Sequence, residues 1–309
     1  MNLLSVVVPV YFEEECINQF ITETTLALDN LDINWEIIFI DDGSTDSTIS
    51  IIKKYTILNE KIKLIQFSYN HGKQLAVTAG IAYASGDIIL TMDPDLQDPP
   101  EEIENFVNEI NKGFDIVLGI RKEKKDKFFN KFFSKLFWTF LEKTTDIKIP
   151  KGISSMRIFN RKVADKFLEY KEQNRFIEGI LMHIGMKRGT LLINQRERYA
   201  GKSKFSFKRK VKLAFNVIFD YSELPLKIVV KLGFYLFLFG ILFMIAIILL
   251  KLTLINFQIG WPSLICSIIL GSGLQIFFIG IAALYIGRIY KETKGRPLYS
   301  IIETTNFKI

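Results

Sequence analysis

The sequence DIILTMDPD at residues 87–95 places two carboxylates directly after an apolar run. The run predicts a buried strand, so Asp93 and Asp95 are expected at the carboxyl edge of a sheet, where open α/β sheets bind ligands. Pro94 lacks a backbone donor and fixes φ, which favours a stiff turn over a helix. Two carboxylates suit Mg²⁺ or Mn²⁺, which bind through hard oxygen ligands and a substrate's phosphates. The alternative is a loop of solvated aspartates.

The first 120 residues around this stretch alternate between strand-like and helix-like patterns. Continuous apolar strands separated by amphipathic segments indicate a mostly parallel sheet covered by helices on both faces. We therefore predict an α/β fold of the nucleotide-binding kind. The expected strands are Leu3–Pro9, Trp35–Ile40, Ile62–Phe67, Asp87–Met92 and Phe114–Gly119, and the expected helices lie near 13–30, 46–58, 72–84 and 100–112.

Two long runs towards the carboxyl terminus carry no charge: Leu232–Leu250 has 19 residues and Leu252–Gly287 has 36. A helix needs about 20 apolar residues to cross a bilayer, so each run predicts a transmembrane helix. Two buried core helices are the less favoured alternative. Basic residues flank the runs, and only Lys251 lies between them. By the positive-inside rule, both termini, and with them the first 210 residues, are expected in the cytoplasm.

Charge is divided along the chain. Residues 1–120 hold 6 Lys and Arg against 20 Asp and Glu, a balance of −14, whereas residues 121–212 hold 26 against 9, a balance of +17. An acidic half followed by a basic segment beside the spans suggests a metal-bearing site that faces anionic lipid. Nucleic acid is the weaker interpretation, because no nucleic-acid-binding motif accompanies the basic block.

Aromatic residues and lysines recur at helical spacing over 127–141, which predicts a helix in the membrane interface with its lysines near phosphates. The alternative is an ordinary helix that packs on the domain or on another subunit. The predicted organisation is a catalytic domain over 1–210, a juxtamembrane amphipathic segment over 211–228, a two-helix transmembrane domain over 229–290 and a cytoplasmic tail over 291–309.

Cysteine and histidine are scarce, with only Cys16, Cys266, His71 and His183 in the whole chain. A disulfide scaffold is therefore not indicated, and a reducing cytoplasmic setting is compatible. A zinc site built on histidines and a hydrolase triad are equally poorly supported.

Three further segments precede the acidic turn: VPVYFE at 8–13, IDDGSTD at 40–46 and NHGKQ at 70–74. The turn itself continues as DPDLQDPP at 93–100. In this order the segments resemble the GT-A glycosyltransferases of family two. The closer resemblance is to the branch that glycosylates polyprenyl phosphates, which includes dolichol-phosphate mannose synthases and bactoprenol glucosyltransferases. It covers roughly residues 3–210, and the two spans fit the bactoprenol enzymes. The resemblance therefore implies an integral protein of the bacterial inner membrane.

The resemblance implies a site for a nucleotide-sugar donor. Asp41 and Asp42 would accept hydrogen bonds from a uracil and a ribose, although the same turn could simply cap a helix. Asp93 and Asp95 would hold the metal on the diphosphate, with Gln97 in support. Phe12 stands where the family usually has Asn. The implied donor-binding residues are Pro9, Tyr11, Glu13, Asp41, Asp42, Gly43, Lys73, Asp93, Gln97 and Arg121, of which Lys73 and Arg121 would face the phosphates.

One segment departs from the family pattern. Relatives often carry an Asp before a Phe-Arg-Leu triplet, but residues 150–158 read PKGISSMRI, and no carboxylate lies between Asp146 and Asp165. A sugar hydroxyl acceptor would need a base, whereas a phosphate with a second pKa of about 6 is already largely dianionic. The departure thus favours a lipid phosphate, or else an altered enzyme. The residues implied for the acceptor phosphate are Arg157, also assigned to catalysis, and Arg198, Ser203 and Lys204 in a segment that resembles the family's Arg-x-x-Gly-x-Ser-Lys element.

The expected activity is the inverting, metal-dependent transfer of one hexose, glucose from UDP-glucose, to undecaprenyl phosphate at the cytoplasmic membrane face. A homo-oligomer is compatible with this activity. A processive polysaccharide synthase is the nearest alternative, because Gln173-Asn174-Arg175-Phe176 partly echoes that class's Gln-x-x-Arg-Trp element. A non-catalytic membrane subunit that binds nucleotide sugar is the alternative from a different class.

Overall fold

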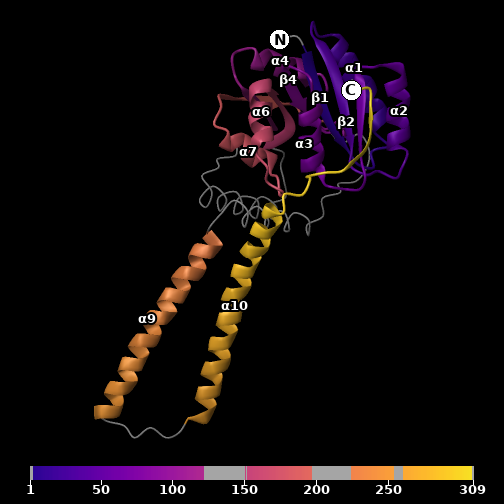
Figure 1. The fold of residues 1–309 in the computed structure, drawn as a ribbon. Coiled ribbons are helices and arrows are strands. Elements are labelled where there is room, and N and C mark those ends of the chain that lie inside the picture. Colours follow the sequence, from indigo (N-terminus) through magenta and orange to yellow (C-terminus); the bar gives the residue numbers. More distant parts are fainter. Residues whose placement is uncertain (1–2, 122–149, 151, 197–223, 254–259, 308–309) are drawn as a thin grey trace. The chain divides into compact units, whose positions relative to one another are not determined.

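The computed structural model describes residues 3–121, 150, 152–196, 224–253 and 260–307 (Figure 1). The predicted interfacial helix at 127–141 and most of the juxtamembrane segment lie outside these residues, as do Arg198, Ser203 and Lys204. The described chain forms two compact units. One contains the α/β domain together with the segment from Pro297 onward, and the other contains the two long carboxy-terminal helices.

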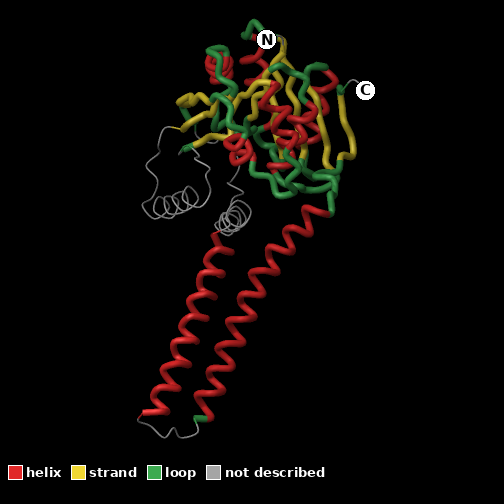
Figure 2. The backbone as a smooth tube through the Cα atoms, turned by 60° about the vertical axis from the view of Figure 1, so that its left-hand side comes forward, coloured by secondary structure: helices red, strands yellow, loops and turns green. Residues whose placement is uncertain are grey.

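Eight strands of the described chain form one sheet in the order β7-β5-β6-β4-β1-β2-β3-β8 (Figure 2). β1 is parallel to β2 and β4, β2 to β3, and β5 to β7, whereas β6 is antiparallel to β4 and β5, and β8 to β3. The strands are β1 (Leu3–Val10), β2 (Asn34–Asp41), β3 (Ile62–Phe67), β4 (Ile88–Thr91), β5 (Ile116–Arg121), β6 (Ile153–Asn160), β7 (Arg188–Ile193) and β8 (Ile301–Thr305).

Helices cover both faces of the sheet, which explains why the central strands read as unbroken apolar runs. β1 and β2 each bury every residue except the first. One face carries α1 (Ile17–Asp29), α2 (Thr48–Leu58) and α4 (Glu102–Ile110). The other carries α3 (Lys73–Tyr83), α6 (Arg161–Glu169) and α7 (Ile177–His183) (Figure 1). The predicted α/β fold with a mostly parallel sheet is confirmed.

The strand order fixes where a ligand site can form. The chain runs from β1 outward through β2 and β3, and then returns to place β4 on the opposite side of β1. In open α/β sheets the crevice at such a switch point, outside the carboxyl ends of the strands, is where ligands bind. The residues after β1 and β4 flank this crevice, and they include Tyr11, Asp93 and Asp95.

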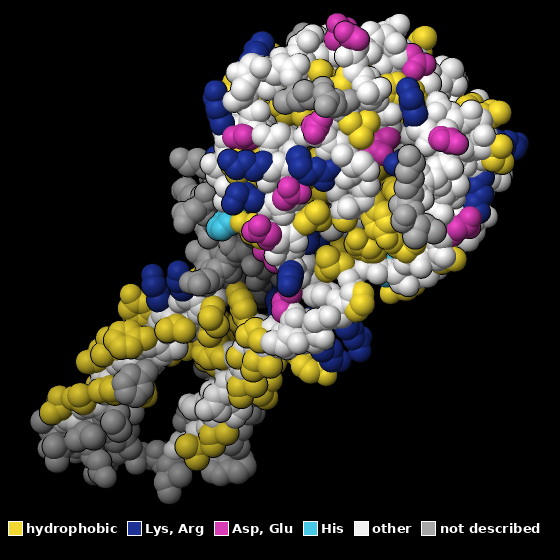
Figure 3. Space-filling model, turned by 45° about the horizontal axis from the view of Figure 1, so that its top comes forward, with side chains coloured by type: hydrophobic (Ala, Val, Ile, Leu, Met, Phe, Trp, Pro, Cys, Tyr) yellow, Lys and Arg dark blue, Asp and Glu magenta, His cyan; other side chains and the backbone are white. Residues whose placement is uncertain are grey.

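The second unit consists of α9 (Leu224–Thr253) and α10 (Trp261–Thr293), which have 30 and 33 residues. Each contains a window apolar enough to cross a membrane, Leu226–Phe243 with a mean hydropathy of 2.1 and Gly271–Thr293 with 1.6, and neither window is buried by protein. Figure 3 shows mostly hydrophobic side chains along these helices. At 1.5 Å per residue, each helix exceeds the roughly 30 Å of a hydrocarbon core.

Candidate active site

The turn after β1 is held by Ser44, in the turn after β2, and by Thr48, the first residue of α2. The backbone N–H of Phe12 donates to Ser44 Oγ at 3.0 Å, and that of Glu13 donates to Thr48 Oγ1 at 2.9 Å. Phe12 has φ of +53°, in the left-handed region that Asn tolerates better than other side chains. The left-handed conformation at this position explains why the family that the sequence resembles usually has Asn there. Phe12 keeps the geometry, and its ring packs against Tyr11 with centroids 4.3 Å apart.

Asp41 ends β2 and closes its own turn. One carboxylate oxygen, Oδ2, accepts the backbone N–H groups of Gly43 at 3.1 Å and Ser44 at 3.0 Å. The other oxygen, Oδ1, is buried and has no hydrogen-bond partner among the described residues. Burial raises the pKa of Asp41 above its usual value, although the bonds from Ser44 and Gly43 oppose the shift. Asp41 therefore retains an unused acceptor at the sheet edge.

Asp42 is also buried, and it binds the loop before α3. Its carboxylate accepts the backbone N–H of His71 at 2.7 Å and that of Gly72 at 2.9 Å. Burial raises the pKa of Asp42 to about 6, against the lowering effect of these two donors. Gly43 is required beside it, because its φ is +80° and an added Cβ would lie 2.8 Å from the Tyr69 carbonyl carbon.

Lys73 and Asp93 meet across the crevice. Lys73 is the first residue of α3, and its Nζ lies 2.6 Å from the Asp93 carboxylate that follows β4. Burial alone would raise the pKa of Asp93, but the Lys73 ammonium outweighs it, with help from Ser155 and Arg121, so the pKa lies below the usual value. Asp93 is therefore ionised at neutral pH and faces two cationic side chains.

The rest of the acidic turn is shaped by its own backbone. Asp95 Oδ1 accepts the Gln97 N–H at 3.2 Å, and Leu96 between them is buried with φ of +56°. The Gln97 side chain is tied in turn to Gln195, whose Nε2 donates to Gln97 Oε1 at 3.1 Å. These contacts fix the direction of the loop that carries Asp95.

Asp98 is a functional candidate that the sequence did not single out. It is 1% exposed and forms a bidentate ion pair with Arg121, at 3.1 Å to Nε and 2.9 Å to Nη2. The hydroxyls of Ser154 and Ser155 also donate to Asp98 Oδ2. The segment before Arg157 has no carboxylate of its own, but the Asp98 carboxylate of the acidic turn lies against it through these two serines. Its position three residues after Asp95 was the only available signal.

Arg157, predicted for catalysis and acceptor binding, lies in β6 and is 4% exposed. Its Nη2 donates to Glu178 Oε1 of α7 at 2.9 Å. Burial would raise the pKa of Glu178, but Arg157 and then Lys73 lower it below the usual value. Arg157 Nη1 and Glu178 Oε2 have no hydrogen-bond partner among the described residues. The sequence could not have revealed Glu178, because α7 was not predicted.

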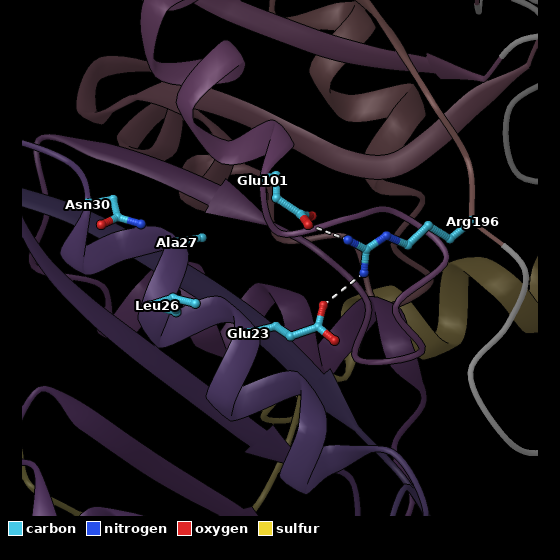
Figure 4. A pocket seen from close by; sticks show the side chains of 6 residues that line it. All are labelled: Glu23, Leu26, Ala27, Asn30, Glu101 and Arg196. Atoms are coloured by element: carbon cyan, nitrogen blue, oxygen red, sulfur yellow. Dashed lines mark hydrogen bonds and ion pairs between the residues drawn. The ribbon is translucent and has the colours of Figure 1, made fainter.

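Arg196 connects the acidic turn to α1. Its guanidinium lies between Glu23, at 2.8 Å from Nη1, and Glu101, which Nη2 contacts (Figure 4). Its backbone N–H donates to the Gln97 carbonyl at 2.9 Å. The three side chains line a cavity of about 230 Å³ together with Leu26, Ala27 and Asn30. Arg196 therefore anchors the chain at the start of the segment predicted to bind the acceptor.

The acidic turn suits a divalent cation in its donor set. Asp93 and Asp95 supply ionisable oxygens at a switch point, and Gln97 supplies an amide oxygen close by. Within the described residues, no group of three His, Cys, Asp or Glu side chains is arranged to hold a metal by itself. One or two carboxylates completed by phosphate oxygens is how Mg²⁺ is usually bound at nucleotide sites.

The sheet order and the acidic turn at its switch point are those of a GT-A glycosyltransferase. Residues 5–168 match the family described as Glycosyl transferase family 2, and the chain belongs to this family. It is an enzyme of the glycosyltransferase class, and its fold and motifs agree with the polyprenyl-phosphate branch that the sequence resembles.

Two relatives are similar over nearly the whole chain. The uncharacterized glycosyltransferase YkcC of Bacillus subtilis (strain 168) is 37% identical over 96% of this chain and 92% of its own length. The undecaprenyl-phosphate 4-deoxy-4-formamido-L-arabinose transferase of Salmonella choleraesuis (strain SC-B67) is 33% identical over 96% of this chain and 92% of its own length. A solved mycobacterial protein shares the fold, with a TM-score of 0.50. It is 17% identical, and the match covers 71% of this chain and 73% of the mycobacterial chain.

Proposed function

We propose that this protein transfers one hexose from a nucleotide sugar to a polyprenyl phosphate at the cytoplasmic face of the membrane, with inversion at the anomeric carbon and with Mg²⁺ or Mn²⁺ as cofactor. The observation that carries the proposal is the meeting of Lys73 with Asp93 at the switch point, beside Asp98 and Arg121. Cationic and acidic side chains at one crevice suit a metal-bound diphosphate.

The acceptor is proposed from the chemistry of the site and from the two apolar helices. Both carboxylates near the Ser154–Arg157 stretch, Asp98 and Glu178, are held in ion pairs with arginine, which leaves them poorly placed to take a proton. A phosphate acceptor needs no such base. The Salmonella relative is named for transfer to undecaprenyl phosphate, which supports the same acceptor class here.

In the proposed mechanism, Asp93 and Asp95 would hold the metal with the donor's diphosphate, and Gln97 would support them. A metal bound there would supply positive charge that offsets the negative charge developing on the leaving group. Lys73 and Arg121 add cationic donors on the phosphate side. A lipid-phosphate oxygen forms a bond to the anomeric carbon while the bond from that carbon to the diphosphate breaks. The electron pair leaves with the nucleoside diphosphate, and no proton needs to move.

The role of the acidic turn can be tested with Asp95→Ala. We expect transfer by purified enzyme to fall by about 100-fold or more, because one electrostatic stabiliser of developing charge typically contributes that much. Asp32→Ala removes an exposed carboxylate ahead of β2 and serves as the control. Turnover that survives in Asp95→Ala would remove the metal role from this residue. Activity should also vanish in chelator and return with Mg²⁺ or Mn²⁺.

UDP-glucose is the proposed donor, and a product screen tests it. The enzyme would be incubated with undecaprenyl phosphate and a panel of nucleotide sugars, including UDP-4-deoxy-4-formamido-L-arabinose, and the glycolipid mass would be recorded. We expect one hexose per lipid, transferred from UDP-glucose. Preference for another donor would change the proposed sugar but not the proposed class of reaction.

A ladder of products in that screen would instead support the processive alternative. The structure gives that alternative little support, because Arg175 of the partial Gln-x-x-Arg element is buried and donates to the carbonyls of Phe167 and Tyr170. Arg175 therefore braces the end of α6 and is not presented to a ligand.

A further inference from the structure

The chain that follows α10 returns to the α/β domain. β8 pairs antiparallel with β3, from Thr305 opposite Leu64 to Ile301 opposite Phe67. The segment is fastened at its far end as well, where Asn306 Nδ2 donates to two carbonyls and Phe307 packs edge-on against Tyr83. This end of the chain therefore forms part of the catalytic unit.

The near end of the segment contacts a loop of the donor site. The backbone N–H of Ser300 donates to His71 Nε2 at 3.3 Å, and the Ser300 carbonyl accepts the N–H of Ser68 at 3.0 Å. Tyr299 stacks on Phe67 with centroids 5.1 Å apart, and Phe67 meets the His71 ring edge-on at 5.3 Å. Burial lowers the pKa of His71, which keeps the ring neutral at pH 7 and Nε2 able to accept.

The loop contacted in this way leads directly into α3, and the first residue of that helix, Lys73, reaches the acidic turn. His71 is fixed on its other side by Asp42, which accepts its backbone N–H at 2.7 Å. Gly72 follows with φ of +99°, and Lys73 then begins α3 and pairs with Asp93 at 2.6 Å. Only Gly72 thus separates His71, which contacts Ser300, from Lys73, whose side chain reaches Asp93.

We infer that His71 is a positioning residue and that residues 299–301, after the second apolar helix, complete the donor site by fixing the loop that presents Lys73. The inference rests on the proposed function, and it adds a structural part that lies outside the matched family region of 5–168.

Protection of the sheet edge is the competing explanation for the segment. An unpaired edge strand invites aggregation, and β8 covers β3. Edge protection accounts for the pairing of β8 but gives no role to the bond between Ser300 and His71, which lies beyond the strand. The two explanations therefore differ in what a change at His71 should do.

The test compares three variants of the full chain in detergent. His71→Phe keeps an aromatic ring and loses the acceptor, and His71→Gln offers an amide oxygen to the same N–H. Glu303→Gln, in the middle of β8, is the control. It alters an exposed ion pair with Lys53 and a hydrogen bond from Gln66, and neither bond involves His71 or Lys73. The measurements are the KM for the donor, the KM for undecaprenyl phosphate, the affinity for UDP with Mn²⁺, and hydrogen exchange over residues 68–73.

His71→Phe should raise the donor KM and weaken UDP binding by about 3- to 10-fold, the usual effect of one lost hydrogen bond, while the acceptor KM stays unchanged. Exchange over 68–73 should become faster, and His71→Gln should recover part of each change. Glu303→Gln should match the wild type in all four measurements.

Equal donor KM, UDP affinity and exchange in His71→Phe and wild type would overturn the inference and leave edge protection as the role of the segment. An equal rise in the donor KM and the acceptor KM would also overturn it, because it would indicate general destabilisation. Hydrogen exchange needs no substrate. A wild-type protein that transfers no sugar would therefore contradict the proposed function while the exchange result still decided the inference.

Discussion

Asp98 accepts hydrogen bonds from a guanidinium and two hydroxyls, so its negative charge organises both Arg121 and the Ser154–Ser155 pair. Asp98→Asn keeps the size and replaces one acceptor oxygen by a donor facing Arg121. We expect a loss in unfolding free energy of roughly 2 kcal/mol, below the value for a fully buried pair, because the Arg121 side chain is 29% exposed. The Tm of thermal unfolding and the rate of sugar transfer should both decrease.

Glu109→Gln provides the comparison for this change, since it breaks an ion pair between Glu109 on α4 and the exposed Lys112 just after that helix. A pair of that kind contributes at most about 1 kcal/mol. If Asp98→Asn were no more destabilising than Glu109→Gln, the organising role of Asp98 would be refuted.

Ser155 is the position at which a missing base can be tested. Its hydroxyl contacts Asp98, and it also helps to lower the pKa of Asp93. Ser155→Asp should lower the rate with undecaprenyl phosphate, because a third carboxylate would repel two existing ones. Gly152 is unsuitable for the same test, since its φ is +73° and an added Cβ would lie 3.1 Å from the Arg121 carbonyl. Ser155→Asn is the neutral control, and a large gain in Ser155→Asp would show that a base had been lacking.

At the scale of elements, Asp42 couples the turn after β2 to the start of α3. Its pKa of about 6 in the fold exceeds the ordinary 3.8, so the folded protein holds a proton that the unfolded chain releases between these values. The contribution of Asp42 to stability is therefore greatest below about pH 4 and is lost as the pH rises through about 6. A shift of this size corresponds to about 3 kcal/mol.

Thermal unfolding of wild type and Asp42→Asn between pH 4 and pH 7 checks this prediction. The difference in Tm, wild type minus variant, should decrease as the pH rises, because Asn does not titrate. A difference that stays constant, or that increases with pH, would contradict the raised pKa.

The sequence predicted the elements whose patterns are local. β1 to β5 and α1 to α4 lie within a few residues of the predicted ranges, because unbroken apolar runs and amphipathic segments reveal burial directly. β6 was missed, although it forms the middle of one half of the sheet, because its pairing with β4 and β5 joins residues far apart in the chain. β8 was missed for the same reason, within the range predicted only as a tail.

The site shows the same division. The acidic residues of the turns could be identified from their order along the chain, and Lys73 and Asp93 do meet. The partners of Arg121 and Arg157 could not be found, because Asp98 reaches Arg121 from the preceding turn and Glu178 reaches Arg157 from α7. Arg157 is placed by β6, which lies antiparallel between β4 and β5, and no local sequence pattern predicts that arrangement.

At the scale of the molecule, chain length limits the topology. Only residues 294–300 separate the end of α10 from β8, which packs in the catalytic unit. Seven extended residues reach roughly 25 Å, less than the 40–45 Å of a bilayer with its headgroups. We therefore expect β8 to lie on the same side of any membrane that α10 crosses as the carboxyl end of that helix, and an even number of spans satisfies this expectation.

We propose the cytoplasm as that side, because the positive-inside rule favours it: Lys227 and Lys231 precede the first uncharged run, and Arg288 and Lys291 follow the second. We expect a fluorescent protein fused after Ile309 to fluoresce in cells, and alkaline phosphatase fused there to stay inactive. Alkaline phosphatase inserted between the two helices, at residues 254–259, should be active, because that connection would be exported. An active phosphatase after Ile309 would reverse the orientation. Activity at neither position would mean that the two helices do not cross the membrane, and the proposed lipid acceptor would lose its main support.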